Sequence, residues 1–170
     1  MLAERGKNRA LVHGARALLV LGGILTPFQA FAEEPAAKRC LAEAVYFEAR
    51  DQGWRGMVAV GVVIKNRVKA AAYPDDICSV VQQGRRRNGK LVRHRCQFSY
   101  FCDGKHERPS EKRAWSLAVD IAALLITTEV EITGIEGATH YHAATIQPSW
   151  ATGLKKRQRI GGHVFYAPLP

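Results

Sequence analysis

The segment 41–56, LAEAVYFEARDQGWRG, constrains the fold most because it joins a helical apolar stripe to a carboxylate. Leu41, Ala44, Val45 and Glu48 follow the i, i+3, i+4, i+7 spacing that puts side chains on one face of a helix. Three of them are apolar, so we expect this face to be buried, with Glu48 at its end. A carboxyl group removed from water has a raised pKa, which suits a general acid working near neutral pH. The spacing alone leaves open a glutamate that only pairs with a nearby arginine.

The N-terminal segment 1–32 has the composition of a cleaved secretory signal. Four basic residues precede a short apolar run at 17–25, and an A-x-A sequence ending at Ala32 precedes Glu33. The apolar run has about nine residues, whereas crossing a bilayer takes about 20. We therefore expect cleavage after Ala32, no stable membrane anchor, and one domain over 33–170.

The charge of the exported part predicts an anionic partner. The whole sequence has 25 lysines and arginines and 15 aspartates and glutamates. Removing the leader takes away four basic residues and one acidic residue, which leaves a formal charge of +7. A basic surface suits nucleic acid, acidic lipid or the anionic groups of a bacterial wall. Export favours the wall, so we expect a protein of the periplasm or cell envelope and no nucleic acid partner.

All four cysteines, Cys40, Cys78, Cys96 and Cys102, lie in the exported part. An even number of cysteines in an oxidising compartment predicts two disulfides, for which three pairings exist. Zinc is disfavoured because the chain has no C-x-x-C pair. Of the three pairings, we choose Cys78 with Cys96 and Cys40 with Cys102, because the first would close the basic loop between its two cysteines.

The hydrophobic pattern predicts a mainly helical chain. A disordered lead-in at 33–37 is expected to precede a helix over 38–50, and a second helix over 54–69 should pack against it as a hairpin. In that second helix we place Lys65, Arg67 and Lys69 toward solvent. Asp75 or Asp76 could cap a short helix that ends near Gly84.

The rest of the chain predicts a loop, a long helix and a small β-structure. We expect the basic segment 85–95 to be a solvated loop and the aromatic segment 96–104 to be compact. A long helix should begin at Ser110, with a core-facing apolar stripe. Alternation at 138–143 and 162–166 predicts a β-hairpin. The expected fold class is α+β, mainly α.

Six ordered blocks in this sequence give it a clear resemblance to a known family. They are YFEAR, VAVGVVIKNRV, YPDDIC, CQFS, GATHYHA with PSW, and IGGHVFY. Together they resemble the SleB-type cell wall hydrolase family, which is named for spore cortex-lytic enzymes. The resemblance covers nearly all of 40–166 and implies a lysozyme-like single domain that cleaves peptidoglycan glycan strands. It implies that Glu48 is the essential catalytic glutamate.

The sequence departs from the family pattern just after Glu48. The family usually reads E-A-R-G-E, whereas this chain has Asp51 and Gln52 in the last two positions. Gln52 can form hydrogen bonds but cannot move a proton. We expect the position to shape the loop, because a lytic transglycosylase needs one acid/base group where an ordinary glycosidase uses two carboxylates.

The same resemblance and the side-chain chemistry suggest six substrate-binding residues: Gln97, Phe98, Ser99, Tyr141, His142 and Trp150. Amides, hydroxyls and aromatic faces are the groups that bind sugar rings and N-acetyl groups. Phe98 could instead belong to the core, and Trp150 could lock the hairpin.

The two histidines of HYH could bind a metal together with His163, but their spacing fits no zinc pattern, so we expect no metal and no cofactor.

The reading that we favour is cleavage between N-acetylmuramic acid and N-acetylglucosamine by a lytic transglycosylase that leaves 1,6-anhydro ends. A hydrolytic muramidase is the alternative within the enzymes, with Asp51, Asp75 or Asp103 activating water. A non-catalytic peptidoglycan-binding protein is the alternative outside them. We expect a monomer, although the sequence leaves the oligomeric state open.

Overall fold

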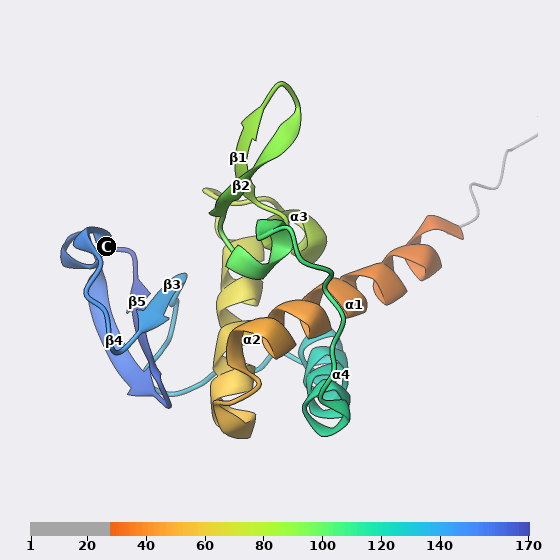
Figure 1. The fold of residues 1–170 in the computed structure, drawn as a ribbon. Helices are drawn as coiled ribbons and strands as arrows, with labels where there is room; N and C mark the ends of the chain where they lie inside the picture. Colours follow the sequence, from red (N-terminus) through yellow and green to blue (C-terminus); the bar gives the residue numbers. More distant parts are fainter. Residues whose placement is uncertain (1–27) are drawn as a thin grey trace, which may run out of the picture.

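The structure is a computed structural model that describes residues 28–170, with side chains from residue 36 onward. A helical body carries two small antiparallel sheets at separate places on its surface (Figure 1). The helices are α1 (Phe28–Ala49), α2 (Gly53–Lys69), α3 (Ile77–Val81) and α4 (Lys112–Thr127), with short 3₁₀ helices at Ser99–Cys102 and Ser149–Gly153. The strands are β1 (Gly84–Arg87), β2 (Lys90–Cys96), β3 (His140–Ala143), β4 (Lys155–Ile160) and β5 (His163–Ala167). The expected mainly helical α+β class is confirmed.

The start of α1 differs from the expectation. The predicted leader falls mostly on residues 1–27, outside the described part of the chain, so its cleavage stays a prediction. The predicted disordered lead-in at 33–37 is wrong, because α1 begins at Phe28 and runs through it. Glutamate and alanine, which make up most of this lead-in, are strong helix formers.

Within the described residues, no helix is both long and apolar enough to cross a membrane.

The core lies where α1, α2 and α4 pack together, and the predicted α1–α2 hairpin is confirmed. Leu41, Ala44 and Val45 are fully buried, as the stripe on α1 predicts. Gly61 lets the helices approach closely, since a Cβ atom there would lie 2.3 Å from Leu125 Cδ1 of α4. A larger residue at position 61 would require the buried Leu125 side chain to move from its place in the core.

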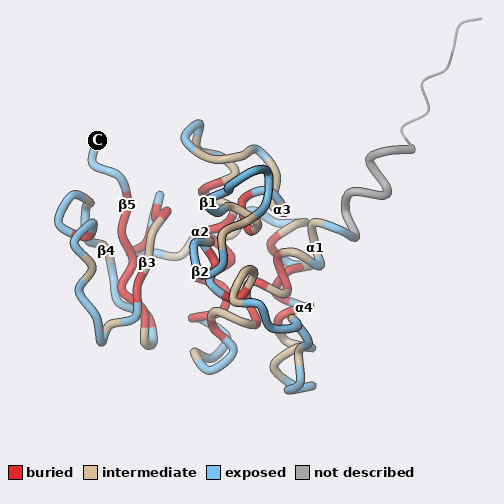
Figure 2. The backbone as a smooth tube through the Cα atoms, turned by 45° about the horizontal axis from the view of Figure 1, so that its top comes forward, coloured by how far each residue is buried: buried red, intermediate tan, exposed pale blue. Residues whose placement is uncertain are grey.

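The basic segment 85–95, expected as a loop, is the β1–β2 hairpin instead. Asn88 and Gly89 form its turn with φ values of 51° and 76°, the left-handed pair that a two-residue hairpin turn needs. An Asn-Gly pair is a strong hairpin signal, and the surrounding charge obscured it here. Figure 2 shows this hairpin exposed over most of its length.

The predicted C-terminal hairpin is part of a three-stranded antiparallel sheet of order β3-β5-β4. β5 lies in the centre and is buried along its whole length (Figure 2). Strand β4, with the sequence KKRQRI, has no apolar alternation that could predict it. It pairs with β5 as an edge strand, where charged side chains protect against pairing with other chains.

The last turn of α2 holds the start of β3 in place. Asn66 Nδ2 donates a hydrogen bond to the Ala138 carbonyl at 2.9 Å, and Arg67 Nε donates to the Thr139 carbonyl at 2.7 Å. The expectation that Arg67 faces solvent is therefore wrong, since only 2% of its surface is exposed. Its guanidinium bonds to a backbone carbonyl far along the chain, which helical periodicity cannot reveal.

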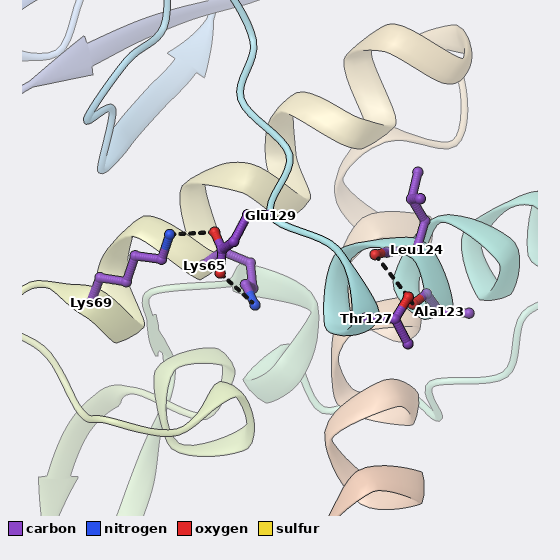
Figure 3. A network of polar contacts seen from close by, with 6 residues as sticks. All are labelled: Lys65, Lys69, Ala123, Leu124, Thr127 and Glu129. Carbon is purple, nitrogen blue, oxygen red and sulfur yellow. Dashed lines mark hydrogen bonds and ion pairs between the residues drawn. The ribbon is translucent and has the colours of Figure 1, made fainter.

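Ion pairs on the neighbouring turn of α2 fasten the segment that leaves α4. Glu129 lies between Lys65 and Lys69, as Figure 3 shows, with 3.8 Å between Lys65 Nζ and its carboxylate. Thr127, the last residue of α4, donates its hydroxyl to the carbonyls of Ala123 at 2.9 Å and Leu124 at 3.3 Å. Because Glu129 is exposed, these pairs orient the connection more than they stabilise the fold.

Two disulfides form, as predicted, but their pairing differs from the one chosen. Cys40 pairs with Cys78, and Cys96 pairs with Cys102. The first joins α1 to α3, two helices that pack together, and the second joins the end of β2 to the adjoining 3₁₀ helix. The chosen clip across the basic segment is not needed there, because hydrogen bonds of the β1–β2 ladder already close it.

The two disulfides should contribute unequally to stability. The Cys40–Cys78 bridge spans 38 positions and the Cys96–Cys102 bridge spans 6. Loop-closure entropy then predicts losses of about 4 and about 2 kcal/mol in unfolding free energy when each is removed. Urea unfolding of the Cys40→Ala/Cys78→Ala and Cys96→Ala/Cys102→Ala proteins measures both losses. An equal or reversed order would contradict the loop-closure argument.

Candidate active site

Glu48 lies in the last turn of α1 and lines a hollow of about 470 Å³ between the helical body and the three-stranded sheet. The walls come from three distant parts of the chain: the end of α2, the segment after β2, and the sheet with the turn that follows β3. The lining residues are Glu48, Arg67, Gln97, Phe98, Ser99, Tyr141, His142, Ala143, Ile146, Pro148, Trp150 and His163.

The Glu48 carboxyl is partly buried and has one close polar partner. The Tyr141 hydroxyl donates a hydrogen bond to Glu48 Oε2 at 3.1 Å. Burial raises the pKa of Glu48, while the Tyr141 hydrogen bond and the charge of Arg67 act in the opposite direction. The balance keeps a proton on Glu48 to higher pH than on a free glutamate. Among the described residues, Oε1 accepts no side-chain hydrogen bond, so this oxygen is free to face a ligand.

Arg67 is a buried cation in the wall beside Glu48. Its Cζ lies 5.3 Å from the ring centroids of both Tyr73 and Phe98. Its Nη1 has no hydrogen-bond partner in the described part of the protein. Burial lowers the pKa of Arg67, and Tyr73, Tyr141 and Glu48 oppose that effect. A guanidinium stays charged even so, so Arg67 places a fixed positive charge near the acid.

A second hollow, of about 510 Å³, lies on the other side of Glu48. It shares Glu48, Ala143 and His163 with the first, so the two form one cleft with the carboxyl in the middle. Asp51 and Glu111 lie in this second part. A cleft that continues on both sides of an acid suits a polymer that is cut within its length.

The structure brings all six predicted binding residues into the first hollow. Gln97 and Ser99 expose their polar groups, whereas Phe98 is buried and contacts the Arg67 guanidinium. Trp150 remains 40% exposed at the edge of the cleft, close to the rings of His142 and Tyr166. An exposed indole ring held in place by neighbouring rings is well suited to stack on a sugar.

His142 is held by hydrogen bonds at both ring nitrogens. Nδ1 donates to the Ala143 carbonyl at 2.9 Å, and Nε2 shares a hydrogen bond of 2.9 Å with the Tyr166 hydroxyl. These two bonds fix the orientation of the His142 ring in the wall of the cleft. No group of three or more metal-ligating side chains occurs in the described part of the chain. The histidines of HYH serve the hydrogen-bond network of the sheet.

Gln52 has a structural partner across the cleft entrance. Its Oε1 accepts a hydrogen bond from the Gly162 backbone at 2.5 Å and so ties the α1–α2 turn to the β4–β5 turn. An amide oxygen fulfils this role without a charge.

Three carboxylates were considered for water activation, and Asp51 is the one that lines the cleft. Asp75 lines neither part of the cleft, and Asp103 lies in a separate hollow with Arg108.

Sequence reasoning missed Arg67 as part of the site and assigned His163 only to a possible metal. His163 lines both parts of the cleft, and its buried Nδ1 has no partner among the described residues. Burial lowers its pKa, which favours the neutral ring. A signal for Arg67 existed, since it follows Ile64 at i+3 on the apolar face of α2. Its charge argued against reading it as buried.

Comparisons with known proteins agree on one family. The family model described as Cell Wall Hydrolase matches residues 51–166, a range that begins three residues after Glu48. The spore cortex-lytic enzyme of Bacillus subtilis is 26% identical over 127 residues, which are 75% of this chain and 36% of that protein. The spore cortex-lytic enzyme of Halalkalibacterium halodurans is 28% identical over 126 residues, covering 74% and 33%. The chain thus spans about a third of the length of these relatives.

Two solved structures have a similar fold. The catalytic domain of the germination-specific lytic transglycosylase SleB from Bacillus anthracis aligns with a TM-score of 0.58 and 26% identity, covering 76% of this chain and 93% of that domain. The catalytic domain of the Bacillus cereus SleB protein aligns with a TM-score of 0.55 and 23% identity, covering 78% and 90%. The second likeness concerns the fold alone.

Replacing Tyr141 by phenylalanine should raise the pKa of Glu48 further. The hydroxyl stabilises the charged carboxylate, so its loss favours the protonated form while the ring keeps its packing. Carboxyl ¹³C NMR titration of Glu48 measures the change. Tyr166→Phe is the matched control, because the Tyr166 hydroxyl bonds to His142 and not to Glu48. A titration midpoint that is the same in wild type and Tyr141→Phe would contradict the assigned contact.

Proposed function

The chain belongs to the cell wall hydrolase family, and we propose that it cleaves peptidoglycan glycan strands between N-acetylmuramic acid and N-acetylglucosamine, with Glu48 as the catalytic acid. We propose the lytic transglycosylase reaction, which leaves 1,6-anhydro ends. The likeness to the catalytic domain of a lytic transglycosylase supports this choice over simple hydrolysis.

One observation carries the proposal: Glu48, a half-buried carboxyl group, lies midway along a cleft that also presents an exposed indole ring, an amide and a hydroxyl. Burial raises the pKa of Glu48. Trp150 offers an exposed ring, and Gln97 and Ser99 offer an amide and a hydroxyl on the same wall. These features favour general acid catalysis on a glycan.

The proposed reaction uses Glu48 twice. The carboxyl first gives its proton to the oxygen that links the two sugars, while the C1–oxygen bond of the muramic sugar breaks with oxocarbenium character. The resulting carboxylate is stabilised by the Tyr141 hydroxyl and the nearby Arg67 charge. It then takes the proton of the C6 hydroxyl, whose oxygen bonds to C1. Glu48 is protonated again, and no water is consumed.

A hydrolytic muramidase is the second candidate, and one observation favours it. Asp51 lines the same cleft as Glu48 and could activate a water on the far side of the sugar. Gln52, which replaces the family's usual glutamate, cannot do so. The two reactions give different products, because hydrolysis leaves a reducing muramic end that is heavier by one water.

We also propose that the protein acts outside the cytoplasm, since its substrate lies in the envelope. The charged leader, short apolar run and A-x-A sequence support export. N-terminal sequencing of the protein recovered from the envelope should find Glu33 as its first residue. Recovery of a chain that still begins at Met1 would refute cleavage.

Glu48→Gln should abolish cleavage while leaving the protein folded. The amide keeps the shape and can still accept from Tyr141, but it cannot transfer a proton. Because the pKa of Glu48 is raised in the fold, the wild-type carboxyl lowers stability as pH rises above its unfolded pKa. The variant should therefore be at least as stable as wild type at pH 8, measured by thermal melting.

Product analysis and a second variant separate the two candidate reactions. Asp51→Asn should retain most activity on purified peptidoglycan, and mass spectrometry of the wild-type products should find anhydro muramic ends. Reducing ends together with an inactive Asp51→Asn protein would reject the transglycosylase in favour of the muramidase. Full activity of Glu48→Gln would reject the catalytic assignment itself.

A further inference from the structure

The β1–β2 hairpin carries an unusual concentration of unpaired positive charge. Its charged side chains are Arg85, Arg86, Arg87, Lys90, Arg93 and Arg95, and all six are exposed. No acidic residue occurs between Gly84 and Cys102. Within the described residues, none of the six forms an ion pair. Mutual repulsion of these cations opposes folding, so an external anion is their natural partner.

The hairpin is fixed in direction rather than loosely attached. The Cys96–Cys102 disulfide ties the end of β2 to the next 3₁₀ helix. Arg93 Nε donates a hydrogen bond to the Asp103 carbonyl at 2.8 Å, and this holds the same strand at a second point. In Figure 1 the hairpin projects away from the helical body. A ligand therefore meets cations that are already held in place, which reduces the entropic cost of binding.

The base of the hairpin adjoins the Glu48 cleft. A hollow of about 380 Å³ lies there, lined by Tyr73, Gln83, Gly84, Arg85, Arg95, Cys96 and Gln97. Gln97 also lines the cleft, so the two hollows meet at this residue. The Gln83 Oε1 atom is buried without a partner in the described part of the protein, which leaves an acceptor for a ligand N–H.

The two ends of the cleft differ in charge. Beyond Gln97, the hollow at the hairpin base presents Arg85 and Arg95 and no carboxylate. Beyond Glu48, the other part of the cleft presents Asp51, Glu111 and Arg50. Arg50 pairs with Glu111 at 2.7 Å, which leaves Asp51 as the carboxylate there without an ion pair among the described residues. An anionic branch of a polymer lying in the cleft is thus attracted to the hairpin side and repelled from the other.

We propose that the base of the β1–β2 hairpin binds carboxylate groups of the stem peptides of peptidoglycan, with Arg85 and Arg95 as the contacting cations. The inference rests on the proposed function, because a glycan in the cleft carries such a peptide on each muramic sugar. That peptide has carboxylates for the two arginines and backbone N–H groups for the Gln83 oxygen. The hairpin selects glycan strands that bear peptides over bare strands.

Binding in the inactive Glu48→Gln background tests the proposal. Co-sedimentation is measured with intact peptidoglycan and with strands whose peptides an amidase has removed. Replacing Arg85 and Arg95 by glutamine should weaken binding to intact peptidoglycan about tenfold, from two charge-assisted contacts, and leave binding to bare strands unchanged. The matched control replaces Lys155 and Lys156, which are exposed on β4 of the other sheet, and should bind like the parent.

If the arginine variant and the lysine control weakened binding to intact peptidoglycan equally, net charge alone would explain the effect, and the proposal would be overturned. Equal loss on intact and bare strands would also overturn it. Tighter, arginine-dependent binding to vesicles of phosphatidylglycerol than to peptidoglycan would assign the hairpin to a membrane surface instead. Activity tests the proposed function separately. In the protein that keeps Glu48, replacing Arg85 and Arg95 by glutamine should raise the KM for intact peptidoglycan and keep kcat. Peptide-dependent binding by a wild-type chain that cleaves nothing would refute the proposed function alone.

Discussion

The buried guanidinium of Arg67 is the interaction on which the arrangement of the site depends. It joins three segments that are distant in sequence: it projects from α2, bonds to the Thr139 carbonyl before β3, and lies between the rings of Tyr73 and Phe98. Burying a charge costs several kcal/mol unless nearby groups compensate it. The carbonyl, the two rings and the neighbouring Glu48 provide that compensation. The cation thereby brings the sheet against the end of α1.

This arrangement explains how one carboxyl group can both hold and release a proton. The apolar helical core withdraws Glu48 from water and raises its pKa. The Tyr141 hydroxyl and Arg67 then limit the rise, so that the charged form remains accessible. The reaction that we propose uses this carboxyl twice, so it needs the protonated and charged forms close in free energy. The helical body provides the burial that favours the protonated form. The Tyr141 hydroxyl of the sheet helps to keep the charged form accessible.

Much of the fold and part of the site could be predicted from the sequence. Local periodicity predicted the pairing of α1 with α2 and the burial of the stripe that ends in Glu48. The sequence left the cap of α3 open between Asp75 and Asp76, and the structure shows that Asp76 accepts from the Ser79 backbone at 2.8 Å. The family blocks named six residues that the fold gathers into one hollow. These features depend on neighbours within a few positions, or on motifs, and both are visible in a single chain.

The tertiary structure alone decided the rest. Strand β4 forms because it completes the edge of β5, although its charged sequence has no strand pattern. The cysteine pairing follows from the packing of α3 on α1 and from the ladder that already closes β1–β2. The environment of Arg67 depends on the Thr139 carbonyl, 72 positions away. The sequence by itself determined the pairing of α1 with α2 and the position of Glu48 at the end of a buried stripe, because these features depend on local spacing. Burial, charge partners and cleft shape depend on contacts between distant segments, and only the folded chain brings these together.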